Sequence, residues 1–281
     1  MERIGVIGAS SLVGRRVLAE LSHADVQVYA FSRSEPESSN GNIQWVQIGS
    51  TVQTLNITIS HWICAAPIWV LSEYLQMIDV YGAQRIVALS STSAISKQNS
   101  SDTLEVNTAK RLQSSENKLQ LWAEKKNITW VILRPTLIYG FNKDKNIAEI
   151  TRFIKRFGFF PLFGQGKGLR MPVHANDVAT ACILSIQHPT VSNYIYNISG
   201  AETLSYKEMV KRIFVTLEKK PRFISIPLNL FKLAVFCMRI FPRYRKWSPV
   251  MAERMNNDLT FEHTDASLHF GYDPRPFDLS K

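Results

Sequence analysis

Cysteine is scarce in this sequence and forms no pattern. The three cysteines, Cys64, Cys182 and Cys237, are far apart, and each lies in an apolar run. This spacing excludes a disulfide framework and a cysteine-based metal site, so we expect buried thiols and no bound metal. The start of the chain, MERIGVIGAS, also lacks the charged and apolar regions of a signal peptide. We therefore expect a cytoplasmic protein.

Long uninterrupted hydrophobic runs are also lacking. The most apolar stretch, residues 223–247, contains Pro227, Lys232 and Arg239 and closes in a basic and aromatic cluster. A membrane-spanning helix needs about 20 mostly apolar residues, which this stretch does not supply. Two interpretations stay open. Either the stretch packs on the rest of the chain or on a second copy in a homodimer, or it forms an interfacial helix in peripheral contact with the inner face of a membrane.

Acidic residues are strongly outnumbered in only one half of the chain. Residues 1–140 contain 12 Lys and Arg against 11 Asp and Glu, whereas residues 141–281 contain 21 against 12. A basic half indicates an anionic partner, such as a phosphorylated small molecule or an anionic membrane surface. The basic clusters contain no RNA- or DNA-binding motif, so we expect no nucleic-acid partner.

Short apolar segments alternate with helical segments over the first 140 residues. We expect buried strands at residues 3–7, 26–31, 43–48, 61–66, 85–90 and 128–133, and helices at residues 69–81 and 105–126. A further helix is expected to open in the segment 8–14 and to run to about Ser22. This alternation predicts an α/β fold with a Rossmann-type doubly wound parallel sheet. We assign residues 1–140 to a Rossmann domain. Residues 141–281 are expected to form mainly a smaller substrate-binding α/β lobe, with a strand near 193–199 that returns to the sheet.

Three helices are expected in the second half, at residues 146–157, 176–187 and 205–218. Asn176 or Asp177 lies near the start of the second helix. Ser205 has Glu208 three residues later, which is the pattern of a capping box.

A glycine turn connects the first strand to the first helix. Gly8 permits a tight turn, Gly14 lets the helix pack closely on the strand, and the helix N-terminus presents free N–H groups to a pyrophosphate. Ser11 stands where the middle glycine of G-x-G-x-x-G would be, which adds a hydroxyl. This context predicts a dinucleotide site.

The end of the second strand bears on the choice of cofactor. NAD sites usually carry an acid there, whereas an arginine suits the additional phosphate of NADP. This sequence reads Phe31-Ser32-Arg33, with no acid before Glu35. The pattern favours NADP over NAD.

Six short motifs occur in order over nearly the whole chain. They are GASSLVG at 8–14, ICAAP at 63–67, ALSSTS at 88–93, LRPTLIYG at 133–140, PVHANDVA at 172–179 and GYDPRPF at 271–277. Taken in this order, the chain resembles the atypical extended short-chain dehydrogenase/reductases, in their NAD(P)-dependent sugar-nucleotide epimerase/dehydratase-like branch. The resemblance implies an anionic sugar-nucleotide substrate held in the C-terminal lobe.

The resemblance also assigns roles to individual residues. It implies a pyrophosphate site at Gly8, Ser10, Ser11, Leu12, Val13 and Gly14, an adenosine-side site at Ser32 and Arg33, a groove floor at Ala65 and Ala66, and a nicotinamide contact at Pro135. Thr92 matches the catalytic Ser/Thr that hydrogen-bonds the reacting substrate oxygen. The implied substrate contacts are Thr136, Lys167 and Arg170, with the two cations near the diphosphate.

The sequence departs from this family at its catalytic pair, Tyr-x-x-x-Lys. The corresponding positions are Thr108 and Leu112, and Lys97 or Lys110 could replace the lysine. Gly49 or Ser50 stands where the family has an adenine-contacting Asp.

His174 and Asp177 invite an acid–base interpretation, but we favour a structural one. In this segment the family uses the Asp near a helix start to cap backbone N–H groups and to hold the lobe together.

Two functions therefore remain. The first is an NAD(P)-dependent oxidoreductase or epimerase acting on a nucleotide-linked sugar, or on a lipid-diphosphate-linked sugar if residues 223–247 are interfacial. The second is a non-catalytic dinucleotide-binding protein, regulatory or involved in assembly, that has lost its catalytic pair.

Overall fold

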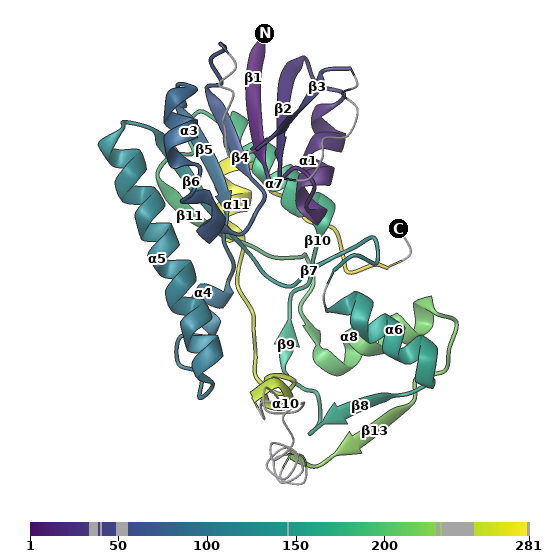
Figure 1. Cartoon of the computed structure of the whole chain (residues 1–281). Helices are drawn as coiled ribbons and strands as arrows, with labels where there is room; N and C mark the ends of the chain where they lie inside the picture. The colour runs from purple at the N-terminus through teal and green to yellow at the C-terminus, as the bar shows by residue number, and fades with distance from the viewer. Residues whose placement is uncertain are drawn as a thin grey trace.

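The computed structural model describes residues 1–33, 39, 41–48, 56–144, 146–228, 231 and 250–279. Its centre is a seven-stranded parallel sheet with the order β11-β6-β5-β4-β1-β2-β3 (Figure 1). The strands are β1 (Glu2–Ile7), β2 (Val26–Ser32), β3 (Ile43–Gln47), β4 (His61–Cys64), β5 (Arg85–Leu89), β6 (Thr129–Pro135) and β11 (Tyr194–Ile198). The predicted doubly wound sheet is confirmed, and the strand expected near 193–199 joins it beside β6.

Helices cover both faces of this sheet. On one face α1 (Leu12–Leu21) packs against α7 (Ala175–Gln187). The other face carries α2 (Ile68–Leu71), α3 (Leu75–Val80) and α5 (Thr103–Lys125), with α4 (Ser93–Ser96) beside the start of α5. The single helix expected at residues 69–81 is wrong, because a turn at Ser72–Tyr74 divides it into α2 and α3.

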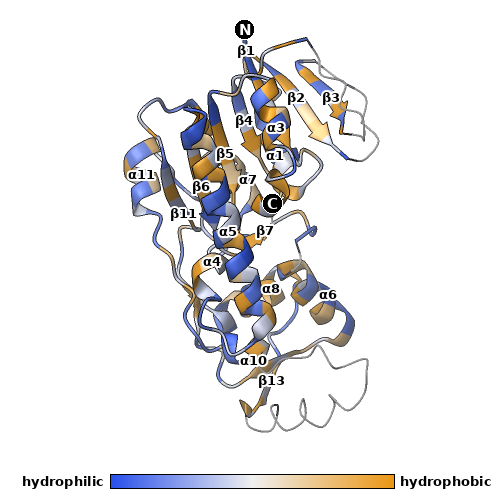
Figure 2. Ribbon diagram, turned by 60° about the vertical axis from the view of Figure 1, so that its left-hand side comes forward, coloured by the Kyte–Doolittle hydropathy of each residue, from blue (hydrophilic) through white to orange (hydrophobic). Residues whose placement is uncertain are grey.

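The strands alternate between two hydrophobic clusters, one on each face. In β2, Val28 and Ala30 belong to the cluster under α1 and α7, whereas Tyr29 and Phe31 belong to the cluster under α3 and α5. Successive side chains of a strand point to opposite faces, so a sheet covered on both sides reads as continuously apolar. Figure 2 shows largely hydrophobic strands, in orange, beside helix α5, which carries many hydrophilic residues, in blue.

The second half builds a smaller lobe below the carboxyl ends of the strands (Figure 1). It contains α6 (Ile147–Phe157), α8 (Tyr206–Thr216), α10 (Val250–Arg254) and three two-stranded sheets. These sheets pair β7 (Ile138–Tyr139) with β10 (Val173–His174), β9 (Leu169–Arg170) with β12 (Leu204–Ser205), and β8 (Phe160–Phe163) with β13 (Phe223–Ile226). A third hydrophobic cluster fills the lobe, and α11 (Thr264–Phe270) returns to pack on β11.

Helix starts in this half agree only in part with the sequence. Ser205 caps α8, with its Oγ accepting the Glu208 N–H at 3.1 Å, as predicted. Helix α7 begins at Ala175, and its cap is His174, whose Nδ1 accepts the Asn176 N–H at 3.2 Å. Asp177 does not cap this helix, but its carboxylate accepts the backbone N–H and the Nε–H of Arg275, so it holds the C-terminal segment, in agreement with the structural role expected for it.

Several expectations fall outside the described residues: those on Glu35, Gly49, Ser50 and Cys237, and most of the stretch 223–247. The first four residues of that stretch form strand β13 and not a helix. Over the part of the chain that the structure describes, no helix has the length and apolarity to cross a membrane. Cys64 and Cys182 are both buried and unpaired, as expected.

Candidate functional site

The glycine turn between β1 and α1 has the geometry of a phosphate cradle. Gly8 adopts φ +75°, and a Cβ there would lie 2.6 Å from the Ala66 nitrogen. A Cβ on Gly14 would lie 2.2 Å from the Gly8 carbonyl oxygen, so any side chain would push helix and strand apart. The turn also leaves first-turn amides of α1 facing outward without an intrahelical acceptor. These residues fit the pyrophosphate of a dinucleotide.

The Ser11 hydroxyl forms hydrogen bonds that stabilise this turn. Its Oγ accepts the Gly14 N–H at 3.0 Å, which caps α1, and donates to the Ala65 carbonyl at 3.0 Å. The hydroxyl therefore joins the turn to the loop after β4, beyond the pyrophosphate role that the sequence predicted.

A groove of about 520 Å³ runs from this turn across the ends of β4, β5 and β6. It brings together many of the predicted cofactor residues: Ser11, Leu12, Val13, Ala65, Ala66 and Pro135. Ser10 faces the neighbouring cavity and accepts a hydrogen bond from Ser32 at 3.4 Å, and Arg33 is exposed just after β2. The predicted nicotinamide contact, Pro135, thus lines the groove together with the glycine turn, whereas the predicted adenosine-side residues Ser32 and Arg33 lie outside its lining.

The sequence did not predict the two charged residues of this groove. Lys143 and Asp144, from the loop after β7, line it opposite the glycine turn. The only signal was their position in the KDK cluster that follows LRPTLIYG. Asp144 is buried, and its Oδ1 accepts the N–H groups of Asn146 and Ala148 at 3.0 Å each, so it caps the start of α6.

The positions of the missing catalytic pair do line the groove. Thr108 and Leu112 both project from α5 into its lining, which supports the register counted from the sequence. The Thr108 hydroxyl donates to the Leu104 carbonyl at 2.8 Å, and Leu112 is buried in the core. Neither residue can supply the acidic phenol or the cation that the family places there.

A second pocket, of about 360 Å³, adjoins the groove. It contains Thr92, Lys97, Thr136, Asn146, Arg170 and Arg254. Ser91, Ser93 and Ile138 line both the pocket and the groove, so a ligand in one meets a ligand in the other at the end of β5. The sequence had separated these residues into catalytic and substrate sets, and the fold brings Thr92, Thr136 and Arg170 together.

Thr92 is held at this junction by β6. Its side chain is buried, and its Oγ1 donates to the Pro135 carbonyl at 3.3 Å, a long hydrogen bond that a substrate oxygen can replace. Thr136 is less available, because its hydroxyl donates to the Met171 carbonyl at 2.5 Å.

Lys97 lies in the same pocket within a charged cluster. Its Nζ lies 3.8 Å from Glu105 Oε1, and that oxygen also accepts Arg254 NH1 at 3.2 Å. Burial, helped by Arg254, lowers the pKa of Lys97, while Glu105 and Asp102 act in the opposite direction. A lysine with a lowered pKa is better able to exchange a proton near neutral pH. Lys110, the alternative from the sequence, is exposed on the outer side of α5.

The two predicted substrate cations differ in their surroundings. Arg170 is buried and donates to the carbonyls of Leu169, Asn257 and Arg254, and burial lowers its pKa to about 10. Lys167 is exposed on the preceding loop, outside the lining of the pocket.

A buried ion pair lies beneath the junction of groove and pocket. Glu116 of α5 is 2% exposed and accepts hydrogen bonds from Arg134 Nε at 2.9 Å and from Ser90 Oγ at 2.5 Å. This pair ties α5 to the ends of β5 and β6, and removing one partner would leave a buried charge uncompensated.

Residues 69–199 match the NAD dependent epimerase/dehydratase family. The match covers the pocket residues Thr92 and Lys97, the whole of α5 and the strands β5, β6 and β11. Over these residues the chain is similar to this family. The resemblance inferred from the sequence is confirmed.

Two curated relatives align over part of the chain. UDP-glucose 4-epimerase from Vibrio cholerae is 26% identical over 119 residues, which are 42% of this chain and 36% of that protein. The mitochondrial NADH dehydrogenase [ubiquinone] 1 alpha subcomplex subunit 9 of Arabidopsis thaliana is 26% identical over 102 residues, 36% of this chain and 25% of that protein. The chain thus spans about a third or less of the length of these two relatives.

Solved structures extend the likeness to the whole chain. UDP-glucuronic acid 4-epimerase from Bacillus cereus in complex with NAD superimposes with a TM-score of 0.74 at 15% identity, covering 99% of this chain and 93% of that one. At this identity the likeness shows a shared fold.

Proposed function

We propose that this protein is an NAD(P)-dependent oxidoreductase or epimerase acting on a nucleotide-linked sugar. The observation that carries the proposal is the junction at Ser91 and Ser93, where a phosphate-cradling groove meets a polar pocket that contains Thr92 and Lys97. Hydride exchange requires such contact between a cofactor and a reacting carbon. The similarity to UDP-glucose 4-epimerase from Vibrio cholerae supports a sugar nucleotide as substrate.

The cofactor assignment rests on the glycine turn and on Arg33. Gly8 and Gly14 let the turn approach Ala66 and let α1 pack directly on the turn, so the N-terminus of α1 borders the groove. Arg33 is exposed at the end of β2, where it can pair with a ribose 2′-phosphate, so we propose that NADP is preferred over NAD. When bound, the nicotinamide supplies the group that accepts or donates the hydride.

The chain itself must bind the sugar oxygen and move its proton. In our proposal the Thr92 hydroxyl exchanges its bond to Pro135 for one to the reacting oxygen. Lys97 then takes the proton in place of the absent tyrosine, because its pKa is lowered and its Nζ lies in the same pocket. Glu105 and Arg254 hold Lys97 in position through their shared ion pairs.

The test is hydride transfer with a panel of UDP- and GDP-sugars, including a lipid-diphosphate-linked sugar, followed by nicotinamide absorbance. Lys97→Gln should lower turnover by about 10²–10⁴-fold, the usual contribution of a general acid–base group, without changing cofactor affinity. The matched control is Lys110→Gln, an exposed lysine on α5. Thr92→Val keeps the shape of the side chain and should also lower turnover. Equal turnover in Lys97→Gln and Lys110→Gln would remove Lys97 from the mechanism.

A second function is favoured by one observation. Thr108 and Leu112 occupy the positions of the catalytic pair and cannot perform its chemistry. A non-catalytic dinucleotide-binding protein with a role in assembly or regulation would have this pattern, and similarity to an NADH dehydrogenase subunit agrees with it. Tight cofactor binding without turnover of any sugar in the panel would decide for this alternative.

A further inference from the structure

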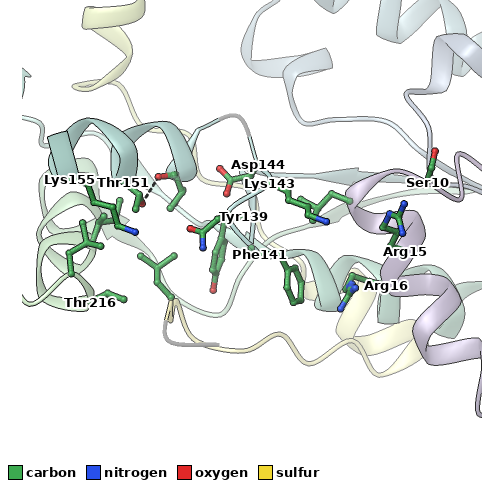
Figure 3. A pocket seen from close by; sticks show the side chains of 17 residues that line it. Ser10, Arg15, Arg16, Tyr139, Phe141, Lys143, Asp144, Thr151, Lys155 and Thr216 are labelled. Atoms are coloured by element: carbon green, nitrogen blue, oxygen red, sulfur yellow. Dashed lines mark hydrogen bonds between the residues drawn. The ribbon is translucent and has the colours of Figure 1, made fainter. Parts of the chain in front are cut away.

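A second large cavity lies on the other side of the loop that borders the cofactor groove (Figure 3). It encloses about 1010 Å³ between the start of α1 and the lobe helices α6 and α8. Leu12, Lys143 and Asp144 line both the cavity and the groove, so the loop around Lys143 separates the two spaces. Of the residues used in the proposed hydride transfer, the cavity shares Ser10 and Leu12 of the glycine turn, whereas Thr92 and Lys97 lie outside its lining.

Most of the charged side chains that line this cavity are cations. Arg15 and Arg16 come from α1, Lys143 from the loop and Lys155 from α6. Among the described residues of the lining, Asp144 is the single acid, and its Oδ1 already accepts two backbone N–H groups. Within the described ranges, neither Lys143 nor Lys155 forms an ion pair. A concave site with four cations and one committed carboxylate focuses a positive potential.

The charges are spread along the cavity, with Lys143 and Asp144 between its two ends (Figure 3). Figure 3 shows Lys155 and Thr151 at one end and Arg15 and Arg16 at the other, with Tyr139 in between. Apolar side chains from α6, from α8 and the residue after it, and from the C-terminal tail also line the cavity: Ile147, Ile213, Leu217 and Leu279. The guanidinium of Arg16 lies 4.2 Å from the centre of the Phe141 ring, which fixes it at the rim.

We propose that this cavity binds a phosphorylated organic ligand, separately from the dinucleotide. Its volume suits a molecule of nucleotide size, well beyond a bare inorganic ion. The cations fit phosphate oxygens, and the apolar side chains of the lining fit an uncharged body next to them. Two sources share this chemistry: a soluble phosphate ester and the headgroup of an anionic phospholipid.

Lys155 offers the cleanest test because it lines this cavity and neither the groove nor the pocket beside it. It is exposed, so Lys155→Gln removes the charge without disturbing the core. Lys118→Gln, at an exposed lysine of α5, is the matched control. Inorganic pyrophosphate is titrated calorimetrically into the full chain in the presence of saturating NADPH, so that the glycine turn is occupied. NADPH affinity, measured alone, reports on the groove independently.

We expect pyrophosphate to bind about tenfold more weakly to Lys155→Gln than to the wild type, as for the loss of one charge-assisted contact, and equally to Lys118→Gln. In parallel, the three proteins are sedimented with phosphatidylcholine vesicles containing phosphatidic acid. Lys155-dependent binding to pyrophosphate alone indicates a soluble ligand, and Lys155-dependent binding to the vesicles indicates a lipid. If neither probe binds, or if both bind Lys155→Gln as tightly as the wild type, the proposal is overturned.

Discussion

The α1 end and the α5 end of the cofactor groove differ in how far they keep the residues that the family uses there. At the α1 end, the glycine turn keeps the backbone conformation and the close helix–strand contact that a pyrophosphate needs. At the α5 end, the backbone position is kept, but Thr108 and Leu112 replace the reactive side chains. Binding by backbone amides survives side-chain change, whereas acid–base chemistry does not. The comparison indicates that cofactor binding depends on the backbone of the glycine turn, whereas catalysis depends on side chains at the α5 end.

The largest effect is expected from a change at the α1 end. Gly14→Val places atoms where a Cβ alone would already lie 2.2 Å from the Gly8 carbonyl oxygen, so the turn must open. Dinucleotide binding should be abolished, with some loss of stability, as measured by calorimetric titration and thermal unfolding. Retained affinity in a folded Gly14→Val protein would mean that the phosphates bind elsewhere.

A smaller effect is expected from Arg33→Ala. The wild type should bind NADP(H) several-fold more tightly than NAD(H), and Arg33→Ala should remove this preference while sparing NAD affinity. The measurement is a pair of titrations with the two reduced cofactors. Equal affinities in the wild type would contradict the NADP assignment, while leaving the groove itself in place.

A pH profile tests the α5 end. If Lys97 accepts the sugar proton, oxidation should increase with pH as Lys97 loses its proton, with an apparent pKa below the usual lysine value of about 10.4. Since the Arg254 cation helps to lower the pKa of Lys97, Arg254→Gln should move this limb to higher pH. Glu105 has the opposite effect, so Glu105→Gln should move it to lower pH. A profile unmoved by both changes would exclude Lys97 as the titrating group.

The smallest effect is expected from Ser11→Ala. This change removes the cap of α1 and the bond to Ala65, so the free energy of unfolding should fall by about 1 kcal/mol. Cofactor affinity should change little, because the Ser11 hydroxyl is engaged within the turn. Thermal unfolding and NADPH titration together check this. A large loss of affinity at unchanged stability would return Ser11 to a direct phosphate contact.

The sequence was sufficient for most of the sheet because buried parallel strands and a glycine turn depend on local patterns. It misplaced the helix at residues 69–81 and the cap of α7, since a turn at Ser72–Tyr74 and a histidine cap at His174 carry weak local signals. The site was predicted where motifs are continuous, as at residues 8–14. The sequence did not predict Lys143 or Lys155 as site residues, and it left Lys97 as one of two alternatives. Tertiary packing alone brings these distant segments together.

We propose that this protein transfers hydride although it lacks the tyrosine of the family, and that the reaction takes place beside the pocket that contains Thr92 and Lys97. The most direct measurement is a single-turnover experiment in which NADP(H)-loaded protein meets each nucleotide sugar and nicotinamide absorbance is followed over time. Our account predicts an absorbance change with at least one sugar, slowed strongly in Lys97→Gln and unchanged in Lys110→Gln. Cofactor that binds tightly but shows no absorbance change with any sugar would contradict it.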